Sequence, residues 1–389
     1  MYNFDEIINR KNTNSLKYDG AVSRGMPQDI LPLWVADMDF KAPQEILAAL
    51  QEATNHGIFG YSEPSSNYFK VLSDWTSHRY NWQPEKEWHL NSPGIVFALV
   101  TAINAFTVPG DAVMIQQPVY YPFKTSVVSN HRKLVDNALV LDELSGKYKI
   151  DFVDFEQKIK AHNVKIFLLC NPHNPVGRVW TQEELTRMGE ICLKYNVVVV
   201  SDEIHADFVY DGYTHRVFTS VSDSFLNNSI VCLSPSKTFN LAGLQFSDVF
   251  IANKVLRESF KKAYDKSGYS QLNTFGIVAA EAAYRYGAPW LDALIAYLAQ
   301  NVTLIEDFLR THIPKIQCVL PEATYLAWLD CRALKLSQKE LDTLIVNKAN
   351  LWLSSGTIFG EQGKGFQRLN FACPRPTLQE ALKQLKRIF

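Results

Sequence analysis

Four short apolar runs in the middle of the chain constrain its fold more than any other feature. They are "AVMIQQP" (112–118), "KIFLLCNP" (165–172), "VVVVSDEI" (197–204) and "IVCLSPSK" (230–237). Their apolar residues are continuous rather than alternating, which is typical of strands covered on both faces. Helical patterns lie between the runs, and one begins at Thr181 with Glu184 in the capping-box position. The pattern predicts an α/β architecture with a mainly parallel central sheet.

The pattern changes after about Gly287. A long helical stretch over residues 289–312 precedes the alternating segments "TYLAWLD" and "FQRLNFA". A last helix is expected to start at Thr377, with Glu380 in the capping-box position. These features predict a smaller α+β domain. We expect a large domain over residues 46–286 and a small domain made of residues 1–45 and 287–389.

The charge balance excludes some classes of partner. Lys and Arg number 39 and Asp and Glu 40, so a nucleic-acid-binding surface with a basic excess is not expected. No apolar run approaches the roughly 20 residues that span a bilayer, and the N-terminus "MYNFDEIINRKN" has no apolar signal core, so no membrane partner is expected. The six cysteines lack CxxC spacing, which indicates reduced thiols of a cytoplasmic protein and no metal site.

The polar ends of the four runs predict one shared site, because ligands bind at the carboxyl ends of strands in an open parallel sheet. Asp202 comes just after a run of four valines, and Lys237 ends the last run. A buried carboxylate requires a cation or a protonated nitrogen nearby. The pair therefore indicates a pyridoxal phosphate (PLP) site, in which Asp202 holds the ring nitrogen and Lys237 the aldehyde. Taken singly, the lysine would be a surface residue and the aspartate a turn residue.

The order of six motifs resembles that of fold-type I PLP-dependent enzymes in the class I/II aminotransferase superfamily. The motifs are "SPGIVFAL", "QPVYYPF", "NPHNPVG", "SDEIH", "SPSKTFN" and "GFQRLNFACPR", and they cover nearly the whole chain. Within the superfamily, "LPLWVADMDF", "HGIFGYS" and "SKTFNLAGLQ" resemble the cystathionine β-lyase (C–S lyase) branch, called the MalY/PatB group. The resemblance implies a large PLP-binding domain and a smaller α+β domain.

The resemblance also implies a role for each site residue. Lys237 would bind the cofactor as a Schiff base and move the Cα proton, while Asp202 would keep the ring nitrogen protonated. The other cofactor-binding residues would be Tyr120 on the ring face, Asn174 and His205 around the ring, the amides of Ile95 and Val96, the hydroxyls of Ser234 and Ser236, and Tyr61 of the neighbouring subunit. The substrate-binding residues would be Arg368, which clamps the α-carboxylate, with Asn174 and Tyr121. Tyr121 is also the alternative to Tyr120 as the stacking ring.

Two positions depart from the aminotransferase pattern. Gln245 lies eight residues after Lys237, where aminotransferases usually carry an arginine on the phosphate. His205 lies three residues after Asp202, where they usually carry a tyrosine. Both changes resemble the C–S lyase branch. Gln245 leaves one phosphate partner missing or supplied from elsewhere, and His205 leaves the partner of the ring oxygen open.

The expected function is a PLP-dependent carbon–sulfur β-lyase that cleaves L-cystathionine, L-cysteine or related S-conjugates to a thiol, pyruvate and ammonia. An aminotransferase is the alternative, because it shares the first half of the reaction. A regulatory or binding protein on the same fold is a third interpretation. The enzyme-like pattern begins within the first few tens of residues, so a DNA-binding module is not expected. We expect a homodimer with shared active sites.

Overall fold

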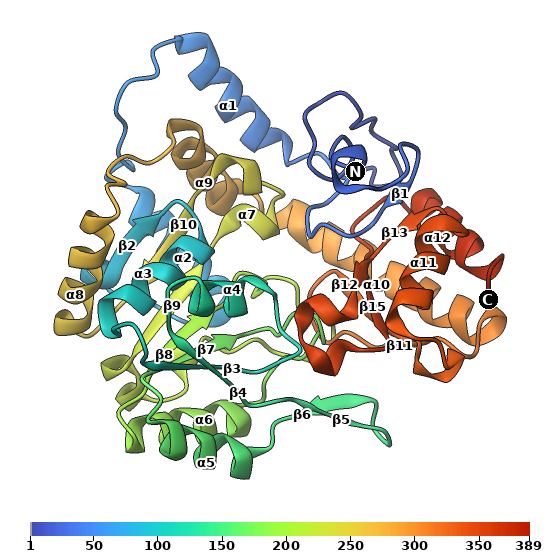
Figure 1. Ribbon diagram of the computed structural model, residues 1–389. Coiled ribbons are helices and arrows are strands. Elements are labelled where there is room, and N and C mark those ends of the chain that lie inside the picture. Colours follow the sequence, from blue (N-terminus) through green and yellow to red (C-terminus); the bar gives the residue numbers. More distant parts are fainter. Residues whose placement is uncertain (1) are drawn as a thin grey trace.

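A seven-stranded sheet forms the centre of the computed structural model, which describes residues 2–389 (Figure 1). The strand order is β2-β10-β9-β8-β7-β3-β4. Neighbours from β9 to β4 run parallel, whereas β10 is antiparallel to both β9 and β2. The strands are β2 (His89–Ser92), β3 (Ala112–Ile115), β4 (Lys133–Asp136), β7 (Ile166–Cys170), β8 (Val198–Asp202), β9 (Ser229–Leu233) and β10 (Ser247–Phe250). The four predicted strands are therefore adjacent, and the prediction of a mainly parallel sheet is confirmed.

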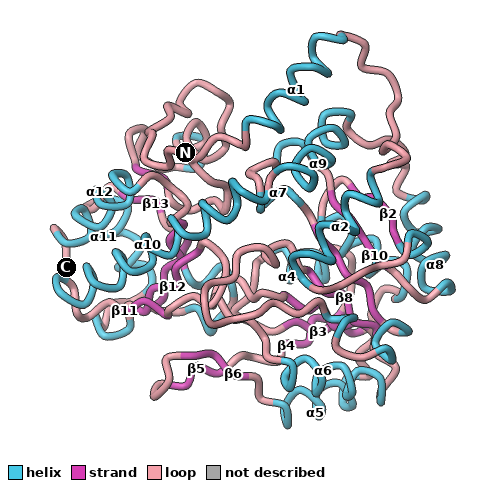
Figure 2. The backbone as a smooth tube through the Cα atoms, turned by 180° about the vertical axis from the view of Figure 1, so that it is seen from behind, coloured by secondary structure: helices cyan, strands magenta, loops and turns pink. Residues whose placement is uncertain are grey.

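Helices cover both faces of this sheet (Figures 1 and 2). Along β3, Val113 and Ile115 enter one apolar core, whereas Met114 enters the core on the opposite face. Both faces are buried, which explains why the apolar runs do not alternate. The helices around the sheet are α2 (Tyr68–Tyr80), α3 (Ile95–Phe106), α4 (Pro122–Val128), α5 (Phe152–His162), α6 (Gln182–Lys194), α7 (Pro235–Thr238), α8 (Lys254–Lys266) and α9 (Thr274–Tyr286).

A four-stranded antiparallel sheet forms a second layer in the C-terminal part, in the order β11-β12-β15-β14. Its elements are β11 (Gln317–Val319), β12 (Leu326–Asp330), β14 (Ser354–Ser355) and β15 (Phe366–Asn370), with α10 (Ala288–His312), α11 (Gln338–Asn347) and α12 (Arg375–Lys386). The N-terminal segment lies against this part, because β1 (Leu31–Pro32) pairs with β13 (Leu351–Trp352). The domain boundaries near residues 46 and 286 stay a prediction.

Two elements lie outside these layers. Helix α1 (Gln44–His56) packs on α9 and projects from the body of the molecule (Figure 1). Strands β5 (Val140–Asp142) and β6 (Lys147–Lys149) form a separate hairpin. Within residues 2–389, no helix has both the length and the hydropathy of a membrane span.

The two predicted capping boxes have different outcomes. The box at α6 is confirmed, since the Thr181 hydroxyl accepts from the Glu184 amide and the Glu184 carboxylate accepts from the Thr181 amide. The start at Thr377 is wrong: α12 begins at Arg375, after Pro374, and has no side-chain cap. Proline suits the first turn of a helix because its amide would be unpaired there. Pro376 therefore belongs to the helix rather than preceding it.

Candidate active site

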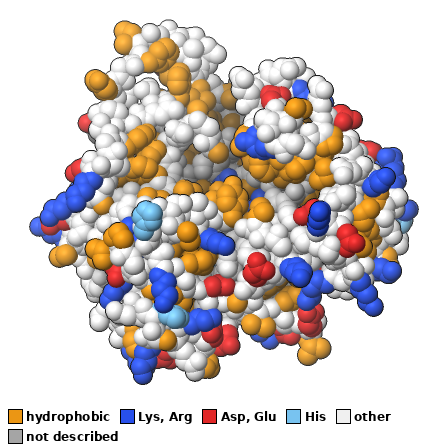
Figure 3. Space-filling view, viewed as in Figure 1, with side chains coloured by type: hydrophobic (Ala, Val, Ile, Leu, Met, Phe, Trp, Pro, Cys, Tyr) orange, Lys and Arg blue, Asp and Glu red, His pale blue; other side chains and the backbone are white. Residues whose placement is uncertain are grey.

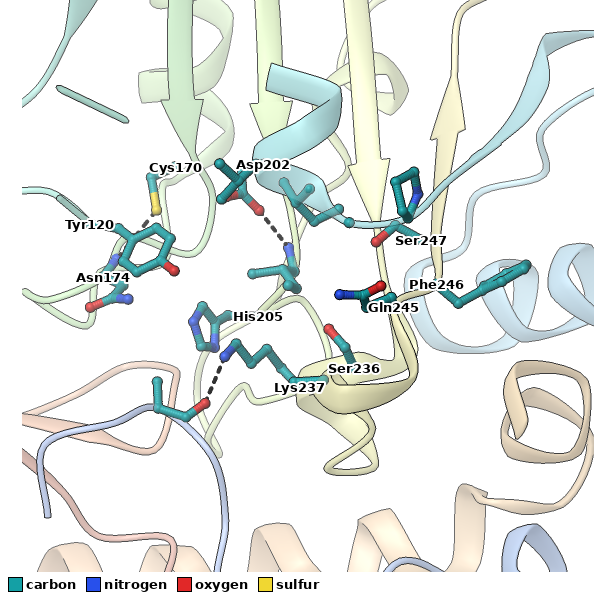
Figure 4. A pocket seen from close by; sticks show the side chains of 17 residues that line it. Tyr120, Cys170, Asn174, Asp202, His205, Ser236, Lys237, Gln245, Phe246 and Ser247 are labelled. Atoms are coloured by element: carbon teal, nitrogen blue, oxygen red, sulfur yellow. Dashed lines mark hydrogen bonds between the residues drawn. The ribbon is translucent and has the colours of Figure 1, made fainter. Parts of the chain in front are cut away.

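A cavity lies at the carboxyl edge of the large sheet (Figure 4). Register brings the edge together, because Asp202 at the end of β8 pairs with Cys170 on β7 and Cys232 on β9. The cavity is lined by eight of the residues predicted from the sequence: Ile95, Val96, Tyr120, Asn174, Asp202, His205, Ser236 and Lys237. The shared site expected from four strand ends is therefore present.

Lys237 is presented by a short turn of helix directly after β9. The Ser234 hydroxyl caps this turn by accepting from the Ser236 amide at 3.1 Å, and Pro235 occupies the first helical position. The Lys237 Nζ donates to the Ala36 carbonyl at 2.6 Å. Burial lowers the pKa of Lys237 to about 8, while Asp37 opposes that change. An amine with a lowered pKa can act as a nucleophile or base near neutral pH.

The Asp202 carboxyl is buried and lacks a charged partner. One of its oxygens accepts from the Ile204 amide at 3.2 Å. In the part of the chain that the structure describes, no lysine, arginine or histidine nitrogen lies within ion-pair distance of it. Burial raises the pKa of Asp202 to about 7. This environment suits a protonated ring nitrogen, which would supply the missing cation.

Three loops, after β3, β7 and β8, bring Tyr120, Asn174 and His205 around the same cavity. The Tyr120 amide donates to the Asn174 carbonyl at 2.9 Å, which joins the loop after β3 to the loop after β7. Burial raises the pKa of Tyr120 to about 12 and lowers the pKa of His205 to about 3. The buried Nδ1 of His205 has no hydrogen-bond partner among the described residues. His205 is therefore neutral and free to bond a ligand.

Arg368 reaches the site from β15 of the small sheet. It donates to the Asn174 side-chain oxygen at 3.1 Å and to the Trp34 carbonyl at 2.8 Å, and it lies over the Phe359 ring. Burial lowers the pKa of Arg368 to about 10. Among residues 2–389, no carboxylate lies within ion-pair distance of the guanidinium. A buried guanidinium without an anion is suited to bind a substrate carboxylate.

The opposite end of the cavity is formed by the N-terminus of α3. Gly94, Ile95 and Val96 line the cavity there, and the first-turn amides of a helix bind anions. Gln245 also lines this end, in a left-handed conformation with φ 54°. Ser236 lies nearby, whereas the Ser234 hydroxyl is directed to the Phe246 carbonyl at 2.8 Å.

Two predicted tyrosines do not line this cavity. Tyr61 lies on the loop between α1 and α2 and is 93% exposed. Tyr121 is half exposed, with its ring centre 5.3 Å from that of Tyr120. The cofactor role of Tyr61 therefore requires a second copy of the chain.

One contact was not anticipated from the sequence. The Ala36 carbonyl accepts the hydrogen bond from Lys237, and Cys170 also lines the cavity. Ala36 belongs to "LPLWVADMDF", whose polar residues carried no assigned role. The sequence signal that could have pointed to this contact is the presence of two aspartates, Asp37 and Asp39, next to an apolar segment.

The fold and this cavity define a class of protein: a fold-type I PLP-dependent enzyme, with a lysine and an aspartate at the carboxyl edge of a mainly parallel sheet. The chain belongs to the aminotransferase class I and II family, whose profile matches residues 28–385.

Three similar proteins refine that assignment. The chain is 45% identical to cystathionine beta-lyase PatB of Bacillus subtilis (strain 168), with 99% of each chain covered. It is 38% identical to cystalysin of Treponema denticola, a structure that contains PLP; the TM-score is 0.96, over 100% of this chain and 98% of that one. It is 42% identical to a PLP-bound candidate aminotransferase of Clostridium difficile 630, with a TM-score of 0.97 and 99% of each chain covered. The family and fold predicted from the motifs are confirmed.

Proposed function

We propose that the protein is a PLP-dependent carbon–sulfur β-lyase. It cleaves L-cystathionine, L-cysteine or related S-conjugates to a thiol, pyruvate and ammonia. The observation that carries this proposal is the convergence of Lys237 and Asp202 in one cavity, with the unpaired guanidinium of Arg368 beside it. The similarity to a protein named cystathionine beta-lyase supports the lyase reaction.

The residues of the cavity fit PLP. A protonated pyridine nitrogen would supply the cation that the buried Asp202 carboxyl lacks. The amides at the start of α3, with Ser236, suit the phosphate. Gln245 would add a neutral donor there in place of a charged one. Lys237 is the amine available to the aldehyde.

Each residue has a distinct task in the reaction. Arg368 binds the α-carboxylate and so orients the amino acid. The cofactor, when bound, supplies an electron sink for the negative charge that develops at Cα. Lys237 removes the Cα proton, and its lowered pKa makes the neutral amine available near neutral pH. Asp202 would keep the proton on the ring nitrogen of the bound cofactor, while Tyr120 and Asn174 would orient its ring.

The fate of the Cα electrons separates a lyase from an aminotransferase. A thiolate is a good leaving group, so a sulfur substituent on Cβ leaves once the Cα proton has been removed. An aminotransferase instead returns a proton to the cofactor and then needs a keto acid to complete its cycle. The similarity to a candidate aminotransferase keeps this second function open to test.

Product analysis distinguishes the two functions. With L-cystathionine and no keto acid, a lyase releases homocysteine, pyruvate and ammonia in equal amounts over many turnovers. Turnover that stops after about one equivalent per site, and resumes when a keto acid is added, would establish an aminotransferase instead.

The active unit that we propose is a symmetric homodimer with shared sites. Apolar side chains gather on the projecting α1 and the loop that follows it (Figure 3), and Ile58 and Phe59 are 73% and 58% exposed. Exposed apolar patches of this kind mark interaction surfaces. Tyr61 lies on the same loop and would reach the partner's phosphate site. The six cysteines are free thiols, which suits a reducing cytoplasm.

A further inference from the structure

A segment from the N-terminal part of the chain, residues 34–40, passes beside Lys237, and its Ala36 lines the cavity; we call this segment the strap. Its Ala36 carbonyl accepts from the Lys237 Nζ at 2.6 Å and from the Tyr325 hydroxyl at 3.0 Å. Figure 4 shows the lysine directed to this carbonyl and away from Asp202. The strap therefore determines where the free amine is held.

The strap is fastened to the loop that carries Lys237. Asn240, three residues after the lysine, accepts from the Met38 amide and donates to the Met38 carbonyl, both at 2.9 Å. It also donates to the Phe40 carbonyl at 3.1 Å. These bonds fix the distance between the strap and the lysine.

Hydrogen bonds also join the strap to β15, the strand that carries Arg368. The Arg368 guanidinium donates to the Trp34 carbonyl at 2.8 Å. Two residues further on, the side-chain amide nitrogen of Asn370 donates to the carbonyls of Val35 and Asp37, both at 2.6 Å. The strap thus accepts hydrogen bonds both from Lys237, the proposed base, and from Arg368, the proposed carboxylate-binding residue.

Four charged groups form an ion cluster at the strap: Asp37 and Asp39 belong to the strap, and Arg10 and Lys17 pair with them. Arg10 pairs with Asp37 and Asp39, each at 2.7 Å, and Lys17 pairs with Asp39 at 2.8 Å. The Lys17 side chain is fully buried. A buried charge pair brings little net stability, but breaking it leaves an uncompensated charge, which favours the arrangement in which the pair is kept. Arg10 and Lys17 carry two positive charges and Asp37 and Asp39 carry two negative charges, so the cluster has no formal net charge.

We propose that this cluster, through the strap, positions the Lys237 amine, with Arg10, Lys17, Asp37 and Asp39 as positioning residues. The inference rests on the proposed role of Lys237 as the cofactor-binding base. It assigns a task to an ion cluster none of whose four side chains lines the cavity.

The charges around the Lys237 amine set the direction of the expected effects. Asp37 and Asp202 raise the pKa of Lys237, whereas Arg368 lowers it; His205 is neutral. Asp37→Asn removes one favourable charge and keeps the shape, and Arg10 retains Asp39 as a partner. The variant should therefore fold.

The test measures the amine itself. Full-length protein, stripped of cofactor, is trace-labelled with acetic anhydride between pH 6 and about pH 10, and mass spectrometry follows the Lys237 peptide; a labelling curve of this kind reports the amine pKa. Asp37→Asn should lower that pKa by about one unit, as expected for loss of a nearby opposite charge. Lys17→Met should raise the limiting labelling rate about fivefold, the factor for losing one hydrogen bond to Ala36.

Lys41→Gln is the matched control. Lys41 belongs to the same region and pairs with Glu6 at 2.8 Å, but both side chains are at least half exposed. It should leave the pKa and labelling rate of Lys237 unchanged. If Asp37→Asn folds and gives the wild-type labelling curve, the strap has no positioning role, whether or not Lys17→Met folds. If borohydride traps PLP on another lysine, the proposed function fails instead, because the labelling curve does not depend on where the cofactor binds.

Discussion

At the residue scale, the candidate site contains two buried ionisable groups without a protein partner of opposite charge in contact. Asp202 and Arg368 each lie less than 5% exposed, and the structure places no opposite charge in contact with either among residues 2–389. Leaving a buried charge unpaired is costly, so both groups indicate ligands of opposite charge. Their expected partners are a cationic ring nitrogen and a substrate carboxylate.

Replacing Asp202 with alanine should retain some cofactor but lose most of the rate. Loss of one partner of a buried charged hydrogen bond costs on the order of 2–5 kcal/mol, or roughly 30- to 4,000-fold in rate. Steady-state kinetics with L-cystathionine checks this, with Asp74→Ala, a surface ion-pair aspartate, as the control. Near-normal turnover in Asp202→Ala would remove Asp202 from the mechanism.

Replacing Arg368 with lysine should lower kcat/KM although the charge is kept. Lysine cannot reproduce the planar two-pronged contact with a carboxylate, and a loss of about 1.5–3 kcal/mol, the strength of a charged hydrogen bond, corresponds to roughly 10- to 150-fold. The comparison is made on kcat/KM for L-cystathionine. An unchanged value would mean that the carboxylate is bound elsewhere.

Asp202 should also make the cofactor-free protein less stable as the pH rises. Burial raises its pKa to about 7, so the folded chain keeps a proton that the unfolded chain releases near pH ~4. The free energy of unfolding should then fall by up to about 1.4 kcal/mol per pH unit between these values. His205 and His173, whose pKa values burial lowers, act in the opposite direction.

The measured quantity is therefore the difference in unfolding free energy between wild type and Asp202→Asn. In urea titrations from pH 5 to 7, wild type should lose stability relative to the variant. A difference that does not change with pH would contradict a raised pKa for this carboxyl.

At the element scale, two of the helices that follow strands of the large sheet, α6 and α7, begin at side-chain caps. In α6 the capping box starts the helix directly after the loop that contains Asn174. In α7 a serine cap and a proline form the turn that presents Lys237. The start of each element therefore contributes to the position of a site residue.

Thr181→Ala should destabilise the protein by about 1 kcal/mol, the usual cost of removing an N-cap hydroxyl. Thr303→Ala is the control, because that exposed threonine lies inside α10 and its hydroxyl bonds only to the preceding turn. Urea denaturation should show a lower midpoint for Thr181→Ala alone. Equal midpoints in the two variants would show that the box adds nothing to stability.

At the scale of the whole molecule, the proposed shared site would be completed by a second copy of the chain. Tyr61 is almost fully exposed and does not line the cavity of its own chain. In the symmetric dimer that we propose, Tyr61 and the exposed apolar residues of its loop would meet the partner chain.

Subunit exchange tests the shared site. Lys237→Ala and Tyr61→Ala should each be impaired alone, since each damages every site of its own dimer. In a mixed dimer, one site combines the intact Lys237 of one chain with the intact Tyr61 of the other, so activity should return. If native mass spectrometry proves exchange and activity does not recover, each chain uses its own Tyr61 or none.

The sequence by itself determined the features that depend on neighbouring residues. Continuous apolar runs predicted the buried strands, the spacing of Thr181 and Glu184 predicted a helix start, and ordered motifs predicted the cavity residues around Lys237. Local patterns also misled at Thr377, where Pro376 was compatible with a helix that starts earlier. Only the tertiary structure placed the Ala36 carbonyl on Lys237, a contact between residues 201 positions apart. Such a contact depends on how folded elements pack against one another. The residues next to Ala36 or Lys237 in the sequence therefore do not predict it.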